Sequence, residues 1–160
     1  MKTRNGIDVY VPASTMAHME AHKDVDFNLV EEAVSKIDLE GDFFKGAIDM
    51  GRVVGKTTCV RINSTDNVLY FFRKHRSGRT PFVKGKKPMP TSKVVVIITE
   101  KKNNPGEYKL ITSWYGELAP MEPWDARNKG LSQEEIDACD EFWNTHALIY
   151  DEGQIDMKRR

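Results

Sequence analysis

The chain has 160 residues, of which 39% are hydrophobic, so we expect one sizeable core and a single domain spanning residues 1–160. No stretch approaches the roughly 20 apolar residues of a membrane span, residues 1–10 lack the apolar run of a secretory signal, and two cysteines are too few for a disulfide framework. These features predict a cytoplasmic protein with no membrane partner, whose zero formal net charge conceals a basic middle: residues 45–109 hold 15 Lys and Arg against 4 Asp and Glu.

The first predicted element is a helical part over residues 14–37. Ser14 and Asp26 are suitable N-caps for two helical pieces that meet near Asp24. Apolar residues in the second piece recur at helical spacing, which predicts a face packed on a core. These residues are Leu29, Val30, Ala33, Val34 and Ile37.

A four-stranded antiparallel sheet is predicted within residues 55–115, because four runs there are rich in β-branched and aromatic residues. The runs are Lys56–Ile62, Val68–Lys74, Lys93–Lys101 and Glu107–Tyr115. Short polar turns join the first run to the second and the third to the fourth. The connection from Arg76 to Ser92 is predicted to be a long basic loop.

The end of the chain is predicted to be an irregular loop over residues 116–130 and a helix over residues 132–147. Ser132 and Glu135 form a capping-box pattern at the start of that helix. The expected fold class is therefore α+β, a four-stranded antiparallel sheet with the N-terminal helices and a C-terminal helix packed on it.

Two histidines are candidates for chemistry. His18 and His22 are four residues apart on a predicted helix and project from the same side, which suits a shared metal or an acid and base pair. A metal needs a third ligand, and neither His75 nor His146 has an obvious reason to converge on the pair. Histidines that merely pack or face solvent give the same pattern.

The last predicted strand ends in Leu-Ile-Thr-Ser-Trp-Tyr-Gly, residues 110–116. Strand alternation predicts Leu110, Thr112 and Trp114 on one face of the sheet. Ile111, Ser113 and Tyr115 are then predicted on the other face. Either face presents a hydroxyl beside an aromatic ring, although ordinary strand propensity explains the same residues.

The basic middle supplies candidate phosphate ligands. A positive surface attracts polyanions, and guanidinium groups bind phosphate in bidentate fashion. A solvated basic hairpin with salt bridges to the acidic helices explains the same charge pattern. The candidate substrate-binding cations are Arg52, Arg61, Arg73, Lys74, Lys84, Lys86 and Lys87.

A helix with His18 and His22, followed by an antiparallel sheet ending in residues 110–116, resembles the phage and polymorphic-toxin branch of the barnase/EndoU/colicin/RelE-like ribonuclease superfamily. The resemblance covers roughly His18 to Pro120. The basic insert between the second and third runs is longer than this fold needs, and residues from Met121 onward lie outside the resemblance. It implies a toxin-like, metal-independent endoribonuclease that needs no cofactor.

In such an enzyme the ribose 2′-hydroxyl attacks the neighbouring phosphate and leaves a 2′,3′-cyclic phosphate. The resemblance implies that His18 and His22 act as acid and base, and that Thr112 or Ser113 hydrogen-bonds the phosphate. Tyr115, or Trp114, then stacks a base. The implied partners are RNA, single-stranded or tRNA-like, and an antitoxin or immunity protein.

Two other functions explain the same residues. The first is a nucleic-acid-binding module without catalysis, in which the basic loop and the aromatic residues bind RNA or DNA and the histidines only pack. The second is a partner-binding accessory protein that works through its acidic helices, with Glu134, Glu135 and Asp137 as the test positions.

Overall fold

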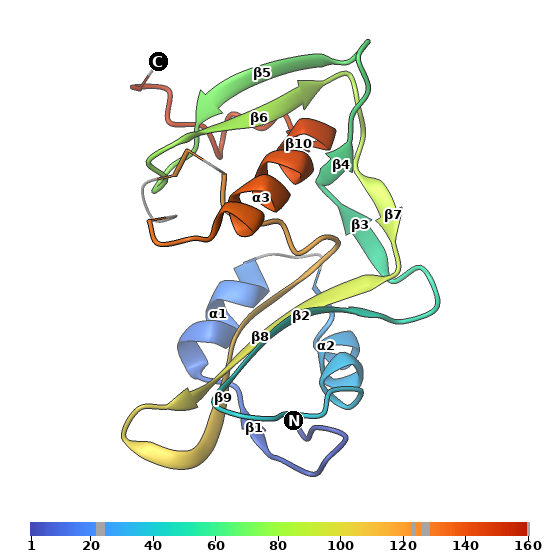
Figure 1. The fold of residues 1–160 in the computed structure, drawn as a ribbon. Coiled ribbons are helices and arrows are strands. Elements are labelled where there is room, and N and C mark those ends of the chain that lie inside the picture. The colour runs from blue at the N-terminus through green and yellow to red at the C-terminus, as the bar shows by residue number, and fades with distance from the viewer. Residues whose placement is uncertain (22–24, 123, 126–128, 160) are drawn as a thin grey trace. The chain divides into compact units, whose positions relative to one another are not determined.

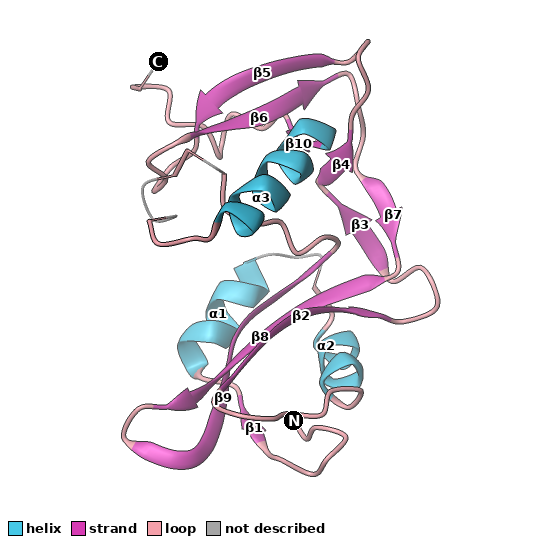
Figure 2. Cartoon of the chain, in the orientation of Figure 1, coloured by secondary structure: helices cyan, strands magenta, loops and turns pink. Residues whose placement is uncertain are grey.

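A computed structural model describes residues 1–21, 25–122, 124–125 and 129–159. The chain divides into two compact units, one made of Met1–Thr57 and Pro90–Leu118, the other of Thr58–Met89 and Ala119–Arg160. The described residues contain three helices together with mixed sheets, so the predicted α+β class is confirmed (Figures 1 and 2). Whether the chain behaves as the single domain expected from its length stays a prediction.

Unit 1 is a four-stranded sheet covered on one face by two helices. Its strands follow the order β1-β9-β8-β2. The elements are β1 (Val9–Tyr10), α1 (Ala13–Ala21), α2 (Phe27–Val34), β2 (Phe43–Asp49), β8 (Lys93–Lys101) and β9 (Asn104–Tyr115). β8 pairs antiparallel with β2 and β9, whereas β1 runs parallel to β9, so this sheet is mixed. A separate two-stranded ribbon joins β3 (Gly55–Thr57) and β7 (Met89–Thr91).

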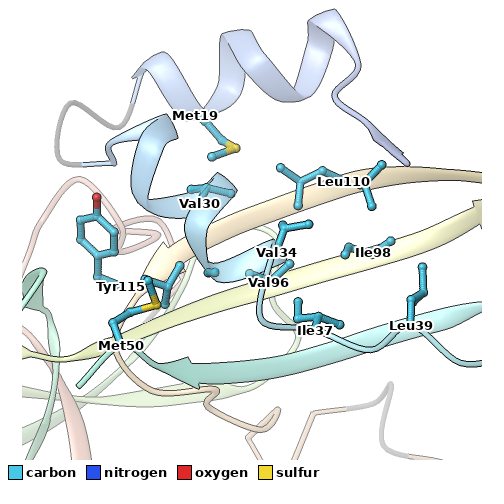
Figure 3. Close-up of a cluster of buried hydrophobic side chains, with 13 residues drawn as sticks. Met19, Val30, Val34, Ile37, Leu39, Met50, Val96, Ile98, Leu110 and Tyr115 are labelled. Carbon is cyan, nitrogen blue, oxygen red and sulfur yellow. The ribbon is translucent and has the colours of Figure 1, made fainter. Parts of the chain in front are cut away.

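The core of unit 1 lies between the helices and the sheet. Figure 3 shows Val30 and Val34 of α2 and Met19 of α1 directed at Ile98 and Leu110 of the sheet, and all five side chains are buried.

The predicted cap Asp26 is confirmed, because its side chain accepts a hydrogen bond from the Asn28 amide at 2.8 Å. The predicted cap Ser14 is wrong, since α1 begins one residue earlier.

Unit 2 is a second mixed sheet with one helix on it. Its strands follow the order β4-β10-β6-β5, and β10 pairs parallel with β6. The elements are β4 (Cys59–Arg61), β5 (Asn67–Phe72), β6 (Arg79–Lys84), α3 (Gln133–Thr145) and β10 (His146–Ile149). The Ser132 capping box predicted for α3 is confirmed. Trp143 of α3 packs with Phe82 and Phe71 on one face of this sheet, which we call the α3 face.

The prediction of one four-stranded antiparallel sheet is wrong, because the four runs divide between the two units. The third and fourth runs become β8 and β9 of unit 1, whereas the second run becomes β5 of unit 2. β2 pairs with β8, and β10 pairs with β4 and β6. Both arise from segments without a clear strand pattern: Lys45, Gly46 and Asp49 interrupt β2, and β10 directly continues a helix.

The predicted loop from Arg76 to Ser92 is also wrong, because it contains β6 and β7. Its glycines and prolines favour a loop, yet Pro81 lies within β6. β10 pairs with β6 only at Phe82 and Val83, so the missing amide of Pro81 interrupts no bond to β10.

None of the helices in the described ranges is long and apolar enough to cross a membrane.

Candidate nucleic-acid interface

The structure describes only one of the two histidines predicted as an acid and base pair. α1 turns Thr15 and Met19 toward the core, and His18 lies on its exposed side. The Thr15 hydroxyl donates to the carbonyl oxygen of Leu110 at 3.1 Å, which fixes this helix against β9. His22 lies outside the described residues. His18 is therefore exposed to solvent.

A β-bulge in β9 overturns the predicted faces of this strand. Ile97 pairs with Thr112 while Ile98 pairs with Leu110, so Ile111 is an extra residue that reverses the alternation beyond it. Leu110 therefore shares the helix-covered face with Ser113 and Tyr115, not with Thr112 and Trp114.

Ser113 and Tyr115 are consequently buried in unit 1 rather than presented to a substrate. The Ser113 hydroxyl donates to the carbonyl oxygen of Val95 at 2.7 Å, and the Tyr115 hydroxyl accepts from the Asp26 amide at 2.7 Å. Figure 3 shows the Tyr115 side chain among the buried residues of this core. Both hydroxyls thus hold parts of the fold together. We assign these two side chains structural roles.

Thr112 and Trp114 lie on the opposite face of the same sheet. Thr112 is in register with Ile97, whose neighbours in β8 point toward the helices. The Trp114 indole donates to the carbonyl oxygen of Glu117 at 3.1 Å. The sheet therefore separates Thr112 from His18, and the structure does not bring these two predicted catalytic residues together.

Three of the predicted phosphate-binding cations are held in ion pairs. Arg52 makes a bidentate pair with Glu32 at 2.8 and 2.9 Å, and its hydrogen bond holds the pKa of that carboxyl below the usual value. Lys86 lies 3.0 Å from Asp66. The Asn63 amide, together with Lys86, lowers the pKa of Asp66. These carboxylates stay charged at neutral pH and compensate their cations.

Arg73, the third of them, belongs to a network within unit 2. Its guanidinium contacts the Glu122 carboxylate at 2.7 Å and the Thr80 hydroxyl at 3.1 Å, and Thr80 also bonds Glu122. Glu122 and Thr80 are completely buried. Arg73 therefore compensates a buried charge, so a phosphate ligand would have to compete with Glu122.

The other predicted cations differ in where they lie. In the described part of the chain, no carboxylate forms an ion pair with Arg61, Lys74, Lys84 or Lys87. Arg61 is in register with His146 on the α3 face, and Lys84 lies on that face over the Tyr150 ring at 4.4 Å. Lys74 is exposed in the turn between β5 and β6.

A pocket that was not predicted from the sequence opens on the other face of this hairpin. We call it the Trp124 pocket; its lining residues are Tyr70, Phe72, Ser77, Gly78, Arg79 and Trp124. It has a volume of about 490 Å³, within the range of small-molecule sites. The alternation of Tyr70 and Phe72 along β5 was a usable signal, but Trp124 lies in an irregular segment far along the chain.

Two cations lie over one aromatic ring of the Trp124 pocket. The guanidinium groups of Arg79 and Arg159 lie over the Phe72 ring, 5.2 and 4.7 Å from its centre. Arg159 also bonds Asp156 at 2.9 Å, whereas Arg79 forms no ion pair with any carboxylate that the structure describes. His75, in the adjoining basic turn, has a left-handed φ of 63°. Aromatic rings together with a cation that no carboxylate compensates are usual elements of single-strand binding sites.

No group of three His, Cys, Asp or Glu side chains able to hold a metal is found among the residues described.

No family model and no curated protein matches the chain. A solved structure, a conserved hypothetical protein from Toxoplasma gondii ME49, is 16% identical with a TM-score of 0.49; the match covers 80% of this chain and 85% of that one. A likeness of this degree carries no argument, so the ribonuclease resemblance stays a prediction.

Proposed function

We propose that this protein binds single-stranded RNA through the turn between β5 and β6 and the Trp124 pocket of unit 2. The observation that supports the proposal is an exposed aromatic pocket lined by Arg79, whose charge no described carboxylate compensates. Trp124 and Tyr70 are 48% and 54% exposed. Large aromatic side chains this exposed, in one pocket with an arginine, are typical of binding surfaces. We place this activity in the cytoplasm.

The salt dependence of RNA affinity tests the proposal. Each phosphate contact to a single strand adds about 0.7 to the slope of log affinity against log salt, because bound counterions are released. The double variant Lys74→Gln/Arg79→Gln is therefore expected to reduce the slope by about 1.4 and to weaken binding of a labelled oligonucleotide. Fluorescence anisotropy at several salt concentrations measures both.

The matched control is Arg61→Gln/Lys84→Gln, which removes the same charge from the α3 face. It should leave the slope nearly unchanged. Equal losses from both double variants would show that only net charge matters, and no binding by the natural protein at low salt would end the proposal.

Ribonuclease activity is a second candidate, favoured by the exposed position of His18 on α1. If His18 and His22 supply the acid and the base, His18→Ala or His22→Ala should each lower RNA cleavage by at least about 10²-fold without unfolding the protein. The assay follows 2′,3′-cyclic phosphate ends with and without a chelator. Cleavage that survives both substitutions, or is lost with chelator, would contradict this mechanism.

The partner-binding alternative stays a prediction for α3. Glu134, Glu135 and Asp137 are exposed on this helix, and Asp137 accepts a hydrogen bond from Gln133 at 2.8 Å. In this alternative the chain is itself an accessory protein, and a partner with a basic surface is the kind that this helix would suit.

A further inference from the structure

We propose that the Trp124 pocket takes one unpaired nucleobase of the bound RNA, stacked on the indole of Trp124, with the adjoining phosphate at the Arg79 guanidinium. This inference rests on the proposed RNA binding and names the part of the ligand that the pocket would recognise. It predicts that the base contributes to the affinity separately from the charge of the RNA backbone.

The geometry of the two exposed rings favours a stacking role for Trp124. Tyr70 meets the indole edge-on, with ring centres 6.4 Å apart and planes inclined by 63°. Within the described ranges, no ring lies parallel to Trp124. Since aromatic rings also gain from offset parallel stacking, a flat ligand would supply the contact that Tyr70 does not.

Trp124 is also held in place before any ligand arrives. Its indole N–H donates to the carbonyl oxygen of Arg79, and Gly78 lies so close beneath the ring that a Cβ there would overlap it. Two residues earlier, Glu122 is anchored by Arg73 and Thr80. A fixed ring loses little conformational entropy on binding. Because its N–H is already used, the indole would recognise a base by its flat face.

Phe72 has a different role from Trp124. The guanidinium groups of Arg79 and Arg159 already lie over its ring, so Phe72 holds cations instead of a base. Arg79 and Trp124 line the same pocket, so this arrangement places positive charge in the pocket that the indole lines. A base with its negatively charged phosphate fits such a pocket, whereas a cationic ligand of the kind that aromatic cages bind would be repelled.

Single-residue changes at Trp124 test the inference with short RNA oligonucleotides, measured by anisotropy. Trp124→Ala should weaken binding about 5- to 100-fold, because one stacked base is lost, while the salt slope stays the same. Trp124→Phe keeps an aromatic face and should retain most of the affinity. Against oligonucleotides that carry only abasic sites, Trp124→Ala should bind as the natural protein does.

The matched control is Tyr10→Ala in unit 1. Tyr10 is also an exposed ring beside a cation, 56% exposed with Lys101 at 4.5 Å, and its loss should leave affinity within about twofold if stacking is confined to the Trp124 pocket. If the protein binds RNA but Trp124→Ala binds equally well, the base-stacking inference is overturned and the proposed function stands. If the natural protein binds no RNA at low salt, both are overturned.

Discussion

Arg73→Ala is expected to destabilise unit 2 by about 3 to 5 kcal/mol, because it removes the cation that compensates the buried carboxylate of Glu122. The Arg73 side chain is 21% exposed and that of Glu122 only 1%, so water replaces little of the lost interaction. Urea denaturation, followed by hydrogen exchange of the β5 and β6 amides, measures the effect in this unit.

The double variant Arg73→Met/Glu122→Leu is the control for this prediction. It removes both charges and fills similar space, so most of the lost stability should return. The prediction is contradicted if Arg73→Ala lowers the free energy of unfolding by less than about 1 kcal/mol and also reduces the salt slope of RNA binding. That outcome would assign Arg73 to phosphate binding, as the sequence predicted.

Gly116→Ala is expected to destabilise unit 1 by about 2 to 5 kcal/mol, the sum of backbone strain and overpacking. Gly116 ends the motif of residues 110–116 and has φ of +115°, a conformation that side chains other than glycine rarely adopt. A Cβ at this position would also overlap the Thr57 side chain of β3. Chemical denaturation of the purified variant gives the change in the free energy of unfolding.

Gly106→Ala separates the two causes. Gly106 also has a positive φ, 86°, but no atom lies within 4 Å of the Cβ position, so only strain of about 1 to 2 kcal/mol is expected. If Gly116→Ala costs no more than Gly106→Ala, the contact with Thr57 is not what requires glycine. A structural reason for Gly116 means that this part of the motif reports the fold, not catalysis.

Local signals made the helices and the long strands predictable. Asp26 and Ser132 cap α2 and α3 as their sequences indicate, and the apolar run Val94–Ile98 lies in β8 between two partner strands. These features depend on residues close together in the chain. Hydrogen bonds at helix ends and strand propensity therefore suffice to predict them.

Pairing between distant segments was not predictable in the same way. The bulge at Ile111 follows from how β9 meets β8 and α1, and one extra residue moved Ser113 and Tyr115 to the buried face. The roles of charged residues were equally hard to predict from the sequence. Arg73 and Lys74 are adjacent in the sequence, yet one compensates Glu122 and the other is exposed, because Glu122 returns to this hairpin from 49 residues away.

The indole resonances of the three tryptophans offer the most direct test of the proposed RNA site. Trp124 lines the pocket in unit 2, Trp143 is buried in α3, and Trp114 lies on β9 of unit 1. A ¹⁵N-labelled protein titrated with single-stranded RNA should show the Trp124 N–H and the amides of residues 70–79 shifting first and most. Shifts confined to Trp114 and the α1 amides, or no shifts at low salt, would contradict the account.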